Sequence, residues 1–403
     1  MRSKNRHVGV ILLGSIGFPF GSATIQRQIQ LAKSLLNANF KVCVINNRSS
    51  HPKFISKREN IKTLGNYQNV NYFYSSLITF KPTNFILRYI VKIIGAILEI
   101  LTIIYLRIFK NYKYFLLRTD MLKDIKYYSK VSKLIGIELI YDYVEYYDST
   151  GKRDLSGVKK HKKDSFDYNF INYVDKVIVI SKFLENHVKS INVEIPTIKI
   201  PPIIDFDYFN NIYFKKKSEQ FFLFCGSIAY LDLIEFIINS YILSNASNND
   251  IKLKLVINGD DSHLQKLNKF VNDKQQKKNI TILTKLPYIE LIQLYKSAKA
   301  LLIPIGNNLQ DDARFPFKIC EYTASKRPII TSDSGAILEF FEDDNNALIA
   351  KSEDLNDFAS KINKIIEQPE AADRIGESGY NLGSKIFNYN TYSQVLRKLI
   401  VAD

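Results

Sequence analysis

Short apolar runs alternate with stretches of helical periodicity along most of the chain. Val8–Leu13 is an apolar run, a helical pattern covers about Ala23 to Asn37, and Lys41–Ile45 is apolar again. The second half opens in the same way, with apolar Phe221–Cys225 before a helical pattern over about Leu231 to Leu243. Strands that alternate with helices favour parallel sheets. The pattern therefore predicts an α/β fold with two Rossmann-like halves.

The length of the chain also indicates two domains. Its 403 residues exceed what one hydrophobic core usually supports. A proline-containing segment near residues 200–220 separates the two βα patterns. We therefore expect an N-terminal domain over residues 1–205, a C-terminal domain over 206–385, and a final helix over 386–403.

One predicted helix, over about residues 84–109, is unusually apolar. It carries four charged residues, which fall within an arc of about 100° when the helix is drawn at about 100° per residue; they are Arg88, Lys92, Glu99 and Arg107. Four charges are too many for a membrane-spanning helix. Two interpretations stay open: a helix lying in a membrane surface, or a helix packed into the domain with one charged stripe in water.

Composition limits the partners and the compartment. The net charge is +16, which predicts an anionic partner. The positive charge is spread over both halves without a basic motif interleaved with aromatics, so we expect no nucleic acid. Three cysteines and five scattered histidines show no metal-ligand spacing, so we expect no metal. The apolar run near the N-terminus is too short for a signal peptide, which favours the cytoplasm.

Residues 300–339 carry the densest group of candidate side chains. Strand, helix and strand patterns follow one another, and Arg314 and Lys318 lie where the helix begins. Glu321 follows one turn later, and Ser334-Gly335 forms a small-residue loop after the second strand. Cations beside a helix N-terminus suit a phosphate, and a carboxylate suits hydroxyls. The alternative is an ordinary charge pair on a surface helix.

The first half offers weaker candidates. A glycine turn that includes Gly21 and Ser22 precedes the first helix and could hold phosphate or sugar through its backbone, or could only make a tight turn. Asp142 and Glu145 follow a predicted strand, where ligands often bind, but they could be solvated loop acids. His161 lies in a basic loop and could simply be a surface residue.

At this point the chain resembles glycosyltransferases of the family 4 type, which have the GT-B fold. The resemblance covers most of the chain and is densest from Phe221 to Ile400. The matching segments are Gly17–Ser22 with Arg27, Val174–Ser181, Ile200–Phe209, Gly226-Ser227, Val256–Asp260, and Phe315–Ile330 with Glu321.

The resemblance implies two Rossmann-like domains facing a central cleft, with the final helix crossing back to the first domain. It implies a donor site in which Glu321 binds ribose, Lys318 or Arg314 balances the diphosphate, and the remaining contacts come from Gly21, Ser22, Gly226, Ser227, Ser334 and Gly335. The acceptor would lie in the N-terminal domain, near Asp142, Glu145 and His161. Such enzymes transfer sugar with retention of configuration and need no bound metal.

Three positions depart from the family pattern. Ala313 stands where the family often has a glutamate, eight residues before Glu321. Ile228–Glu235 lacks the arginine or lysine that usually follows the glycine of the C-terminal domain. Lys326 replaces the glycine that usually ends the helix before Pro328.

The function we expect is a retaining glycosyltransferase that moves a sugar from a nucleotide sugar to a lipid-linked glycan acceptor in bacterial surface polysaccharide synthesis. We expect it on the inner face of the cell membrane, in contact with anionic lipid. Two alternatives keep the fold. One is a catalytically degenerate transferase that serves as a membrane-associated scaffold, and the other is a nucleotide-sugar epimerase of GT-B shape.

Overall fold

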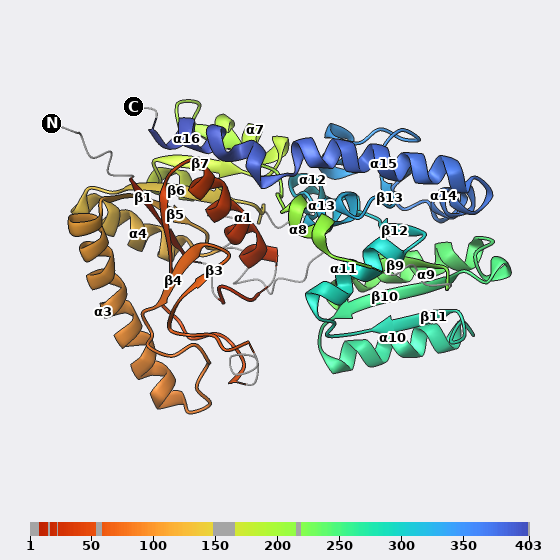
Figure 1. Ribbon diagram of the computed structural model, residues 1–403, viewed down its shortest axis with the longest axis horizontal. Coiled ribbons are helices and arrows are strands. Elements are labelled where there is room, and N and C mark those ends of the chain that lie inside the picture. The colour runs from red at the N-terminus through yellow and green to blue at the C-terminus, as the bar shows by residue number, and fades with distance from the viewer. Residues whose placement is uncertain are drawn as a thin grey trace. The chain divides into compact units, whose positions relative to one another are not determined.

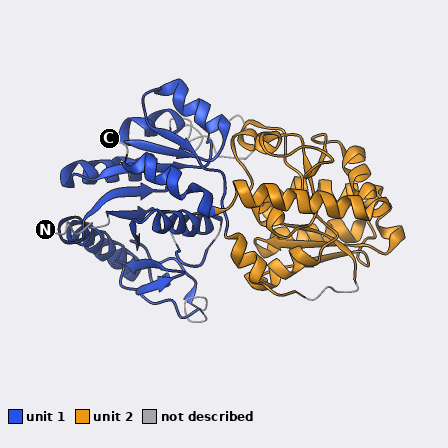
Figure 2. Ribbon diagram, turned by 45° about the horizontal axis from the view of Figure 1, so that its top comes forward, with its two compact units in different colours: residues 1–204, 389–403 blue, residues 205–388 orange. Residues whose placement is uncertain are grey.

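The computed structural model describes residues 8–14, 17–21, 23–53, 59–147, 166–214 and 219–401. The chain divides into two compact units, shown in Figure 2. Unit 1 contains residues 1–204 and 389–403, and unit 2 contains residues 205–388. Each unit is built around its own sheet (Figure 1).

The sheet of unit 1 has the order β3-β4-β2-β1-β5-β6-β7-β8. All its pairs are parallel except β3 with β4. The order reverses between β1 and β5, which is the usual ligand position of a Rossmann sheet. The strands are β1 Gly9–Leu13, β2 Lys41–Asn46, β3 Leu64–Tyr67, β4 Val70–Tyr74, β5 Tyr112–Leu117, β6 Glu138–Tyr143, β7 Lys176–Val179 and β8 Thr197–Lys199.

The end of the chain belongs to unit 1. There Leu396, Leu399 and Ile400 share one apolar core with the buried side of α1. Lys176 Nζ donates to the carbonyl of Ile400 at 3.0 Å, which ties the last helix to β7. The helices of unit 1 are α1 Ala23–Asn37, α3 Phe85–Lys110, α4 Leu122–Ile135, α6 Phe166–Asn169, α7 Lys182–Ile191 and α16 Ser393–Val401, with 3-10 turns η1 Phe170–Tyr173 and η5 Tyr389–Tyr392.

The sheet of unit 2 has the order β11-β10-β9-β12-β13-β14, and every pair is parallel. Its strands are β9 Phe221–Ser227, β10 Lys252–Asn258, β11 Ile280–Leu283, β12 Ala300–Ile303, β13 Ile329–Ser332 and β14 Leu348–Ala350. Its helices are α8 Phe206–Asn211, α9 Leu231–Leu243, α10 Asp261–Asp273, α11 Tyr288–Ser297, α12 Leu309–Ala313, α13 Phe317–Ala324, α14 Leu355–Glu367 and α15 Pro369–Ile386, with 3-10 turns η2 Ile228–Tyr230, η3 Ser247–Asn249 and η4 Gly335–Glu339.

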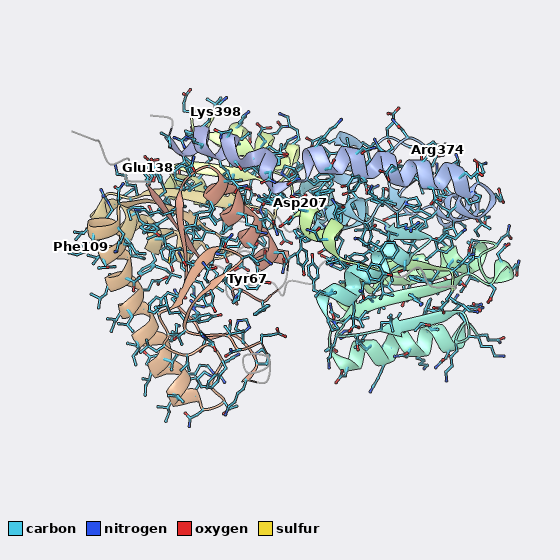
Figure 3. All side chains as sticks on the ribbon, viewed as in Figure 1. Tyr67, Phe109, Glu138, Asp207, Arg374 and Lys398 are labelled. Carbon is cyan, nitrogen blue, oxygen red and sulfur yellow. The ribbon has the colours of Figure 1, made fainter. Side chains whose placement is uncertain are left out.

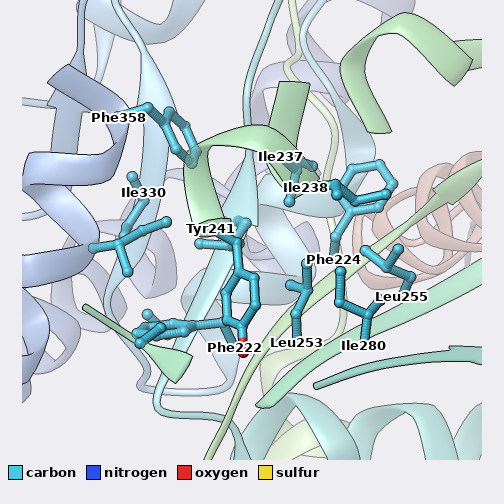
Figure 4. Close-up of a cluster of buried hydrophobic side chains, with 14 of the residues drawn as sticks. Phe222, Phe224, Ile237, Ile238, Tyr241, Leu253, Leu255, Ile280, Ile330 and Phe358 are labelled. Carbon is cyan, nitrogen blue, oxygen red and sulfur yellow. The ribbon is translucent and has the colours of Figure 1, made fainter. Parts of the chain in front are cut away.

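Apolar periodicity on α9 explains how this helix covers the sheet of unit 2. Its fully buried apolar residues recur at helical spacing and are Ile234, Ile237, Ile238 and Tyr241. They join strand residues such as Phe222 and Leu253 in one core, which Figure 4 shows in close-up. Phe236 also packs on Phe358 of α14, with ring centroids 5.4 Å apart. Burial of each large side chain contributes about 1.5–3 kcal/mol.

Three local predictions differ from the structure. The polar sequence of residues 306–313 predicts a loop, but this segment contains the short helix α12, whose first turn is capped by the side chain of Asn308. The polar sequence of residues 48–84 predicts irregular structure with one short strand at Asn71–Tyr74, but β3 also forms there and pairs with β4 across a tight turn. The pattern over Thr197–Ile204 predicts a strand, but β8 ends at Lys199, because Pro201 and Pro202 have no N–H to donate to a neighbouring strand.

Helix α3 buries its charged side and exposes much of its apolar side, which is the reverse of a helix packed into the domain with a charged stripe in water. Its buried residues are Val91, Gly95, Glu99 and Ile103, so the side that carries Glu99 faces unit 1. Many of its large apolar side chains are exposed instead, including Phe109 at the outer edge of unit 1 (Figure 3). The interpretation of a helix with its apolar side in the core and its charges in water is therefore wrong.

Candidate functional site

The donor residues predicted in the C-terminal half gather at one edge of the sheet of unit 2, whereas Gly21 and Ser22 belong to unit 1. Ser227 ends β9, Arg314 lies beyond β12, and Ser334 lies beyond β13. Strands β9 and β12 are neighbours, and the strand order reverses between them. Ligands of open parallel sheets usually bind outside the carboxyl ends of the strands at such a point.

Glu321 lies on α13, and only 1% of its surface is exposed. Its Oε1 accepts a hydrogen bond from the Tyr288 hydroxyl at 2.8 Å, and its Oε2 accepts one from the Tyr295 hydroxyl at 3.2 Å. Lys318 Nζ donates to the same Oε2 at 2.7 Å. Two tyrosines and one lysine thus satisfy the buried carboxylate, as a buried charge requires.

Lys318 bonds to the buried Glu321 carboxylate and is itself partly exposed to solvent. Its Nζ also donates to the Tyr295 hydroxyl at 3.1 Å, and its side chain is 30% exposed. Burial opposes the charge on Lys318, but the neighbouring Glu321 carboxylate favours it, and the net result is a raised pKa. Lys318 is therefore a fixed positive charge at neutral pH, one turn before Glu321 on the same helix.

Arg314 joins the segment after β12 to the segment after β9. Its guanidinium lies over the Tyr230 ring, 4.9 Å from the centroid, and donates to the Tyr230 hydroxyl. It also forms an ion pair with Asp311. Its Nε is buried and has no hydrogen-bond partner. Among the described residues, the Nε–H of the Arg314 guanidinium is therefore a donor that a further acceptor could use.

Ser334 and Gly335 close the loop after β13. Ser334 Oγ donates to the carbonyls of Ile305 and Gly306, at 3.2 and 3.0 Å. Gly335 N donates to Asp312 Oδ1 at 3.0 Å. Gly335 has a φ of 63°, and a side chain there would meet the carbonyl oxygen of Asp311 at 2.6 Å. Only glycine fits this position without strain.

Three of the predicted diphosphate contacts already have a carboxylate partner. Arg314 pairs with Asp311, Lys318 pairs with Glu321, and the N–H of Gly335 pairs with Asp312. A phosphate oxygen that binds Gly335 N would take the place of the Asp312 carboxylate. An external anion at these groups would therefore compete with the three carboxylates.

Gly226 and Ser227 have local structural partners as well. A Cβ at Gly226 would lie 2.5 Å from the Phe224 ring. Ser227 Oγ accepts from the N–H of Ala229 at 3.2 Å and so caps η2. The small size of both residues allows the chain to turn sharply at the end of β9.

In unit 1, Asp142 is only 3% exposed and forms a buried ion pair with Arg27. Arg27 Nε donates to Asp142 Oδ2 at 2.9 Å, and another Arg27 nitrogen donates to Oδ1 at 2.8 Å. Arg27 also donates to the carbonyls of Ile200 and Pro201. The interpretation of Asp142 as a solvated loop acid is therefore wrong. A cavity beside it, of about one water in size, is lined by Leu12, Thr24, Gln28, Leu31, Leu116 and Arg118.

The other predictions in unit 1 have varied outcomes. Glu145 is half-buried in the segment after β6. Gly21 is exposed, and a Cβ there would lie 2.5 Å from a side-chain carbon of Ile25. Ser22 and His161 lie outside the described residues.

Sequence reasoning missed the tyrosines of unit 2. Tyr288 and Tyr295 are seven residues apart on α11 and so share one face of that helix. That spacing was a readable signal, but nothing in the sequence indicated that α11 packs against α13. The sequence also gave no signal that Tyr230 contacts Arg314. Over the described residues, no group of three or more histidine, cysteine, aspartate or glutamate side chains could hold a metal ion.

Solved structures with the same architecture identify the fold class. A structure of Anabaena Alr3699/HepE in complex with UDP and glucose has a TM-score of 0.70, at 14% identity over 98% of this chain and 100% of that one. Sucrose-phosphate synthase from Thermosynechococcus elongatus has a TM-score of 0.73, at 15% identity and the same coverage. TarM has a TM-score of 0.71, at 11% identity over the whole of both chains. The chain has the GT-B fold, as predicted.

Sequence comparison then finds similarity to glycosyltransferases over part of the chain. Residues 205–382 match the family model for glycosyl transferases group 1. An uncharacterized glycosyltransferase of Methanocaldococcus jannaschii is 24% identical over 226 residues, which are 56% of this chain and 59% of that protein. The O-antigen chain mannosyltransferase RfbU of Salmonella typhimurium is 29% identical over 161 residues, which are 40% and 42%. The chain is thus similar to each of these relatives over about half of their length.

These findings confirm the predicted GT-B fold, and they show that most of unit 2 is similar to the group 1 glycosyl transferases. They do not distinguish family 4 or a stereochemical course, and both stay predictions.

Proposed function

We propose that this chain is a retaining glycosyltransferase that moves a sugar from a nucleoside diphosphate donor to a lipid-linked glycan in bacterial surface polysaccharide synthesis. The observation that carries the proposal is the Lys318–Glu321 pair at the strand-reversal point of unit 2, inside the matched group 1 domain. The name of the relative RfbU supports a surface glycan product, and the UDP and glucose held by HepE support a nucleotide-sugar donor.

In this proposal each residue has a defined task. The Glu321 carboxylate binds ribose hydroxyls, which replace the Tyr288 or Tyr295 hydroxyl as hydrogen-bond donors. The Lys318 charge and the N–H of Gly335 hold the diphosphate, with Asp312 displaced from that N–H. Fixed donors around the diphosphate stabilise the charge that develops as the bond to the sugar breaks, and such stabilisation is often the largest catalytic contribution. The leaving phosphate accepts the proton of the acceptor hydroxyl.

The acceptor binds unit 1 in this scheme, near Asp142 and Glu145. Asp142 acts there through Arg27, because its oxygens already accept three hydrogen bonds from that side chain. A lipid-linked acceptor places the reaction at the inner face of the cell membrane. No bound metal takes part, and no nucleic acid is a partner.

A second candidate function is a scaffold that has lost catalysis. Two observations favour it: Ala313 stands in place of the family glutamate, and Arg314, Lys318 and the N–H of Gly335 each already have a carboxylate partner. A scaffold would hold other proteins of a glycan assembly complex and would bind no nucleotide.

Thermal unfolding with a panel of nucleoside diphosphates tests the proposal, first with a chelator and then with magnesium. A ligand at about a hundred times its Kd adds about 2.7 kcal/mol, which raises the Tm by several degrees. We expect a rise with one base, with or without metal. The rise should disappear in Glu321→Ala and persist in Glu377→Ala, which removes an exposed ion pair with Lys326.

The absence of a rise with every nucleotide would favour the scaffold. If binding is found, the anomeric configuration of the glycan product tests retention, and an inverted product would contradict that part of the proposal.

A further inference from the structure

Two neighbouring helices form one outer face of unit 1, which we call the α3–α4 face. Tyr128 of α4 donates from its hydroxyl to Glu99 Oε1 on α3 at 2.8 Å. Arg107 of α3 donates to the carbonyl of Ile135, the last residue of α4, at 3.2 Å. These contacts fix the two helices side by side.

The outer side of α3 is apolar over its whole length. Its exposed large side chains are Phe85, Ile86, Leu87, Tyr89, Ile90, Ile93, Ile94, Ile97, Leu101, Tyr105, Ile108 and Phe109. A helix of 26 residues is about 39 Å long. The exposed apolar side chains of α3 therefore form one continuous surface, whereas those of a typical monomer are scattered singly. Large apolar patches of this kind mark interaction sites.

Helix α4 adds basic residues and two apolar ones to the same face. Its exposed lysines recur at helical spacing and are Lys123, Lys126, Lys130 and Lys133. Tyr127 and Leu134 are also exposed, and Leu134 is 85% exposed. The acidic residues of the two helices are Glu99, which is buried, and Asp124, which is half-buried. The α3–α4 face therefore combines apolar surface with positive charge and presents no fully exposed carboxylate.

We propose that the α3–α4 face binds the surface of an anionic lipid bilayer, with α3 lying in the interface and the α4 lysines contacting lipid headgroups. Apolar side chains on one side of a helix can enter the boundary between headgroups and acyl chains. Each lysine near an anionic surface strengthens binding about fivefold. The inference rests on this surface alone and does not require the proposed transfer reaction.

The structure argues against two other occupants. Helix α3 is long and apolar enough to cross a membrane by composition alone. However, a crossing would remove Glu99 from Tyr128 and Asn47, and would separate Gly95 from the Asn47 backbone that it touches. A second copy of the chain would bring two lysine-rich faces together without exposed carboxylates along these helices to neutralise them.

Vesicle flotation of the full chain tests the inference. The vesicles contain about 30% phosphatidylglycerol in phosphatidylcholine, or phosphatidylcholine alone. We expect binding to the anionic vesicles that weakens with salt. Ile97→Glu with Leu101→Glu should weaken it at least about 30-fold, because both side chains are exposed and would enter the lipid. Leu243→Glu, an equally exposed residue at the end of α9, should bind as wild type.

A second pair of variants separates the charge contribution. Lys123→Gln with Lys130→Gln should weaken binding roughly 25-fold at low salt; Lys126 is left unchanged because its Nζ lies over the Tyr173 ring, 5.1 Å from the centroid. Lys266→Gln with Lys269→Gln on α10 makes the same change of charge on unit 2 and should have little effect.

Three results would overturn the inference. The first is equal flotation of wild type and the Ile97→Glu/Leu101→Glu variant, and the second is no flotation of either. The third is a dimer in lipid-free solution that this variant dissociates, which would assign the α3–α4 face to a second copy of the chain. Nucleotide-induced stabilisation, measured separately without vesicles, reports on the proposed function whatever the vesicles show.

Discussion

Asp142 in unit 1 and Glu321 in unit 2 are both buried carboxylates near the strand-reversal point of a Rossmann sheet, but their partners differ. Asp142 faces Arg27, whose side chain is itself 5% exposed and also bonds two backbone carbonyls. Glu321 faces two tyrosine hydroxyls and Lys318, whose side chain reaches solvent. The Asp142–Arg27 pair is buried on both sides and ties parts of unit 1 together. The partners of Glu321 include tyrosine hydroxyls that a ligand hydroxyl could replace.

The largest loss of stability is expected when the buried Asp142–Arg27 pair is broken. Arg27→Ala leaves the Asp142 charge buried without its cation, which typically costs about 3–5 kcal/mol. Urea denaturation of the full chain measures the loss. Lys182→Ala, which breaks an exposed pair with Glu185, should cost less than about 1 kcal/mol. A loss of less than about 1 kcal/mol in Arg27→Ala would show that the Asp142–Arg27 pair does not stabilise the fold of unit 1.

A third buried carboxylate, Glu99 on α3, sharpens the comparison because its hydrogen-bond partners among the described residues are neutral side chains. It accepts hydrogen bonds from Asn47 and Tyr128, and burial raises its pKa to about 7. The folded state therefore binds this proton more tightly than the unfolded state. The free energy of unfolding should fall as the pH rises from about 4.5 to 7, by on the order of 3 kcal/mol, and then level off.

Denaturation of wild type and Glu99→Gln across this pH range measures that contribution. The glutamine variant keeps an oxygen acceptor for Tyr128 but cannot ionise, so its curve should lack this fall. Parallel curves for the two proteins would contradict the assignment to Glu99.

The exchangeable pair should respond to ligand chemistry. Glu321→Gln should weaken a ribonucleoside diphosphate about 5- to 100-fold, because it removes charge-assisted hydrogen bonds to ribose hydroxyls. The variant should bind the 2′,3′-dideoxy analogue, which lacks both hydroxyls, with nearly the wild-type affinity for that analogue. Calorimetric titration of both ligands measures the difference, and equal losses for both would separate Glu321 from the ribose.

The smallest effect is expected for one tyrosine. Tyr288→Phe removes a single hydrogen bond to Glu321, which should cost about 0.5–1.5 kcal/mol of stability. Tyr208→Phe removes the hydroxyl of the residue that stacks on Tyr288 and is the matched control. A cost above about 3 kcal/mol in Tyr288→Phe would mean that the tyrosine holds the fold of unit 2 and is not replaceable by ligand.

Most strands and helices could be predicted from the sequence, because continuous apolar runs and helical periodicity depend on local apolar spacing. Helix α12 and strand β3 could not, because their segments are polar and short. The sequence also placed Arg314, Lys318 and Glu321 near one helix start, since they are close in sequence. It could not show the Asp142–Arg27 pair, whose members are 115 residues apart. Nor could it show which side of α3 faces the core, because a buried Glu99 runs against the usual cost of burying a charge.

The most direct test of the central claim compares ligands with and without phosphate at Lys318. Titration calorimetry would compare the nucleoside diphosphate that stabilises the protein with its nucleoside, in wild type, Lys318→Met and the control Lys326→Met. The account predicts that Lys318→Met loses about 10- to 100-fold in affinity for the diphosphate and little for the nucleoside, while Lys326→Met matches wild type. Unchanged diphosphate affinity in Lys318→Met would contradict the account, because the donor site would then lie elsewhere.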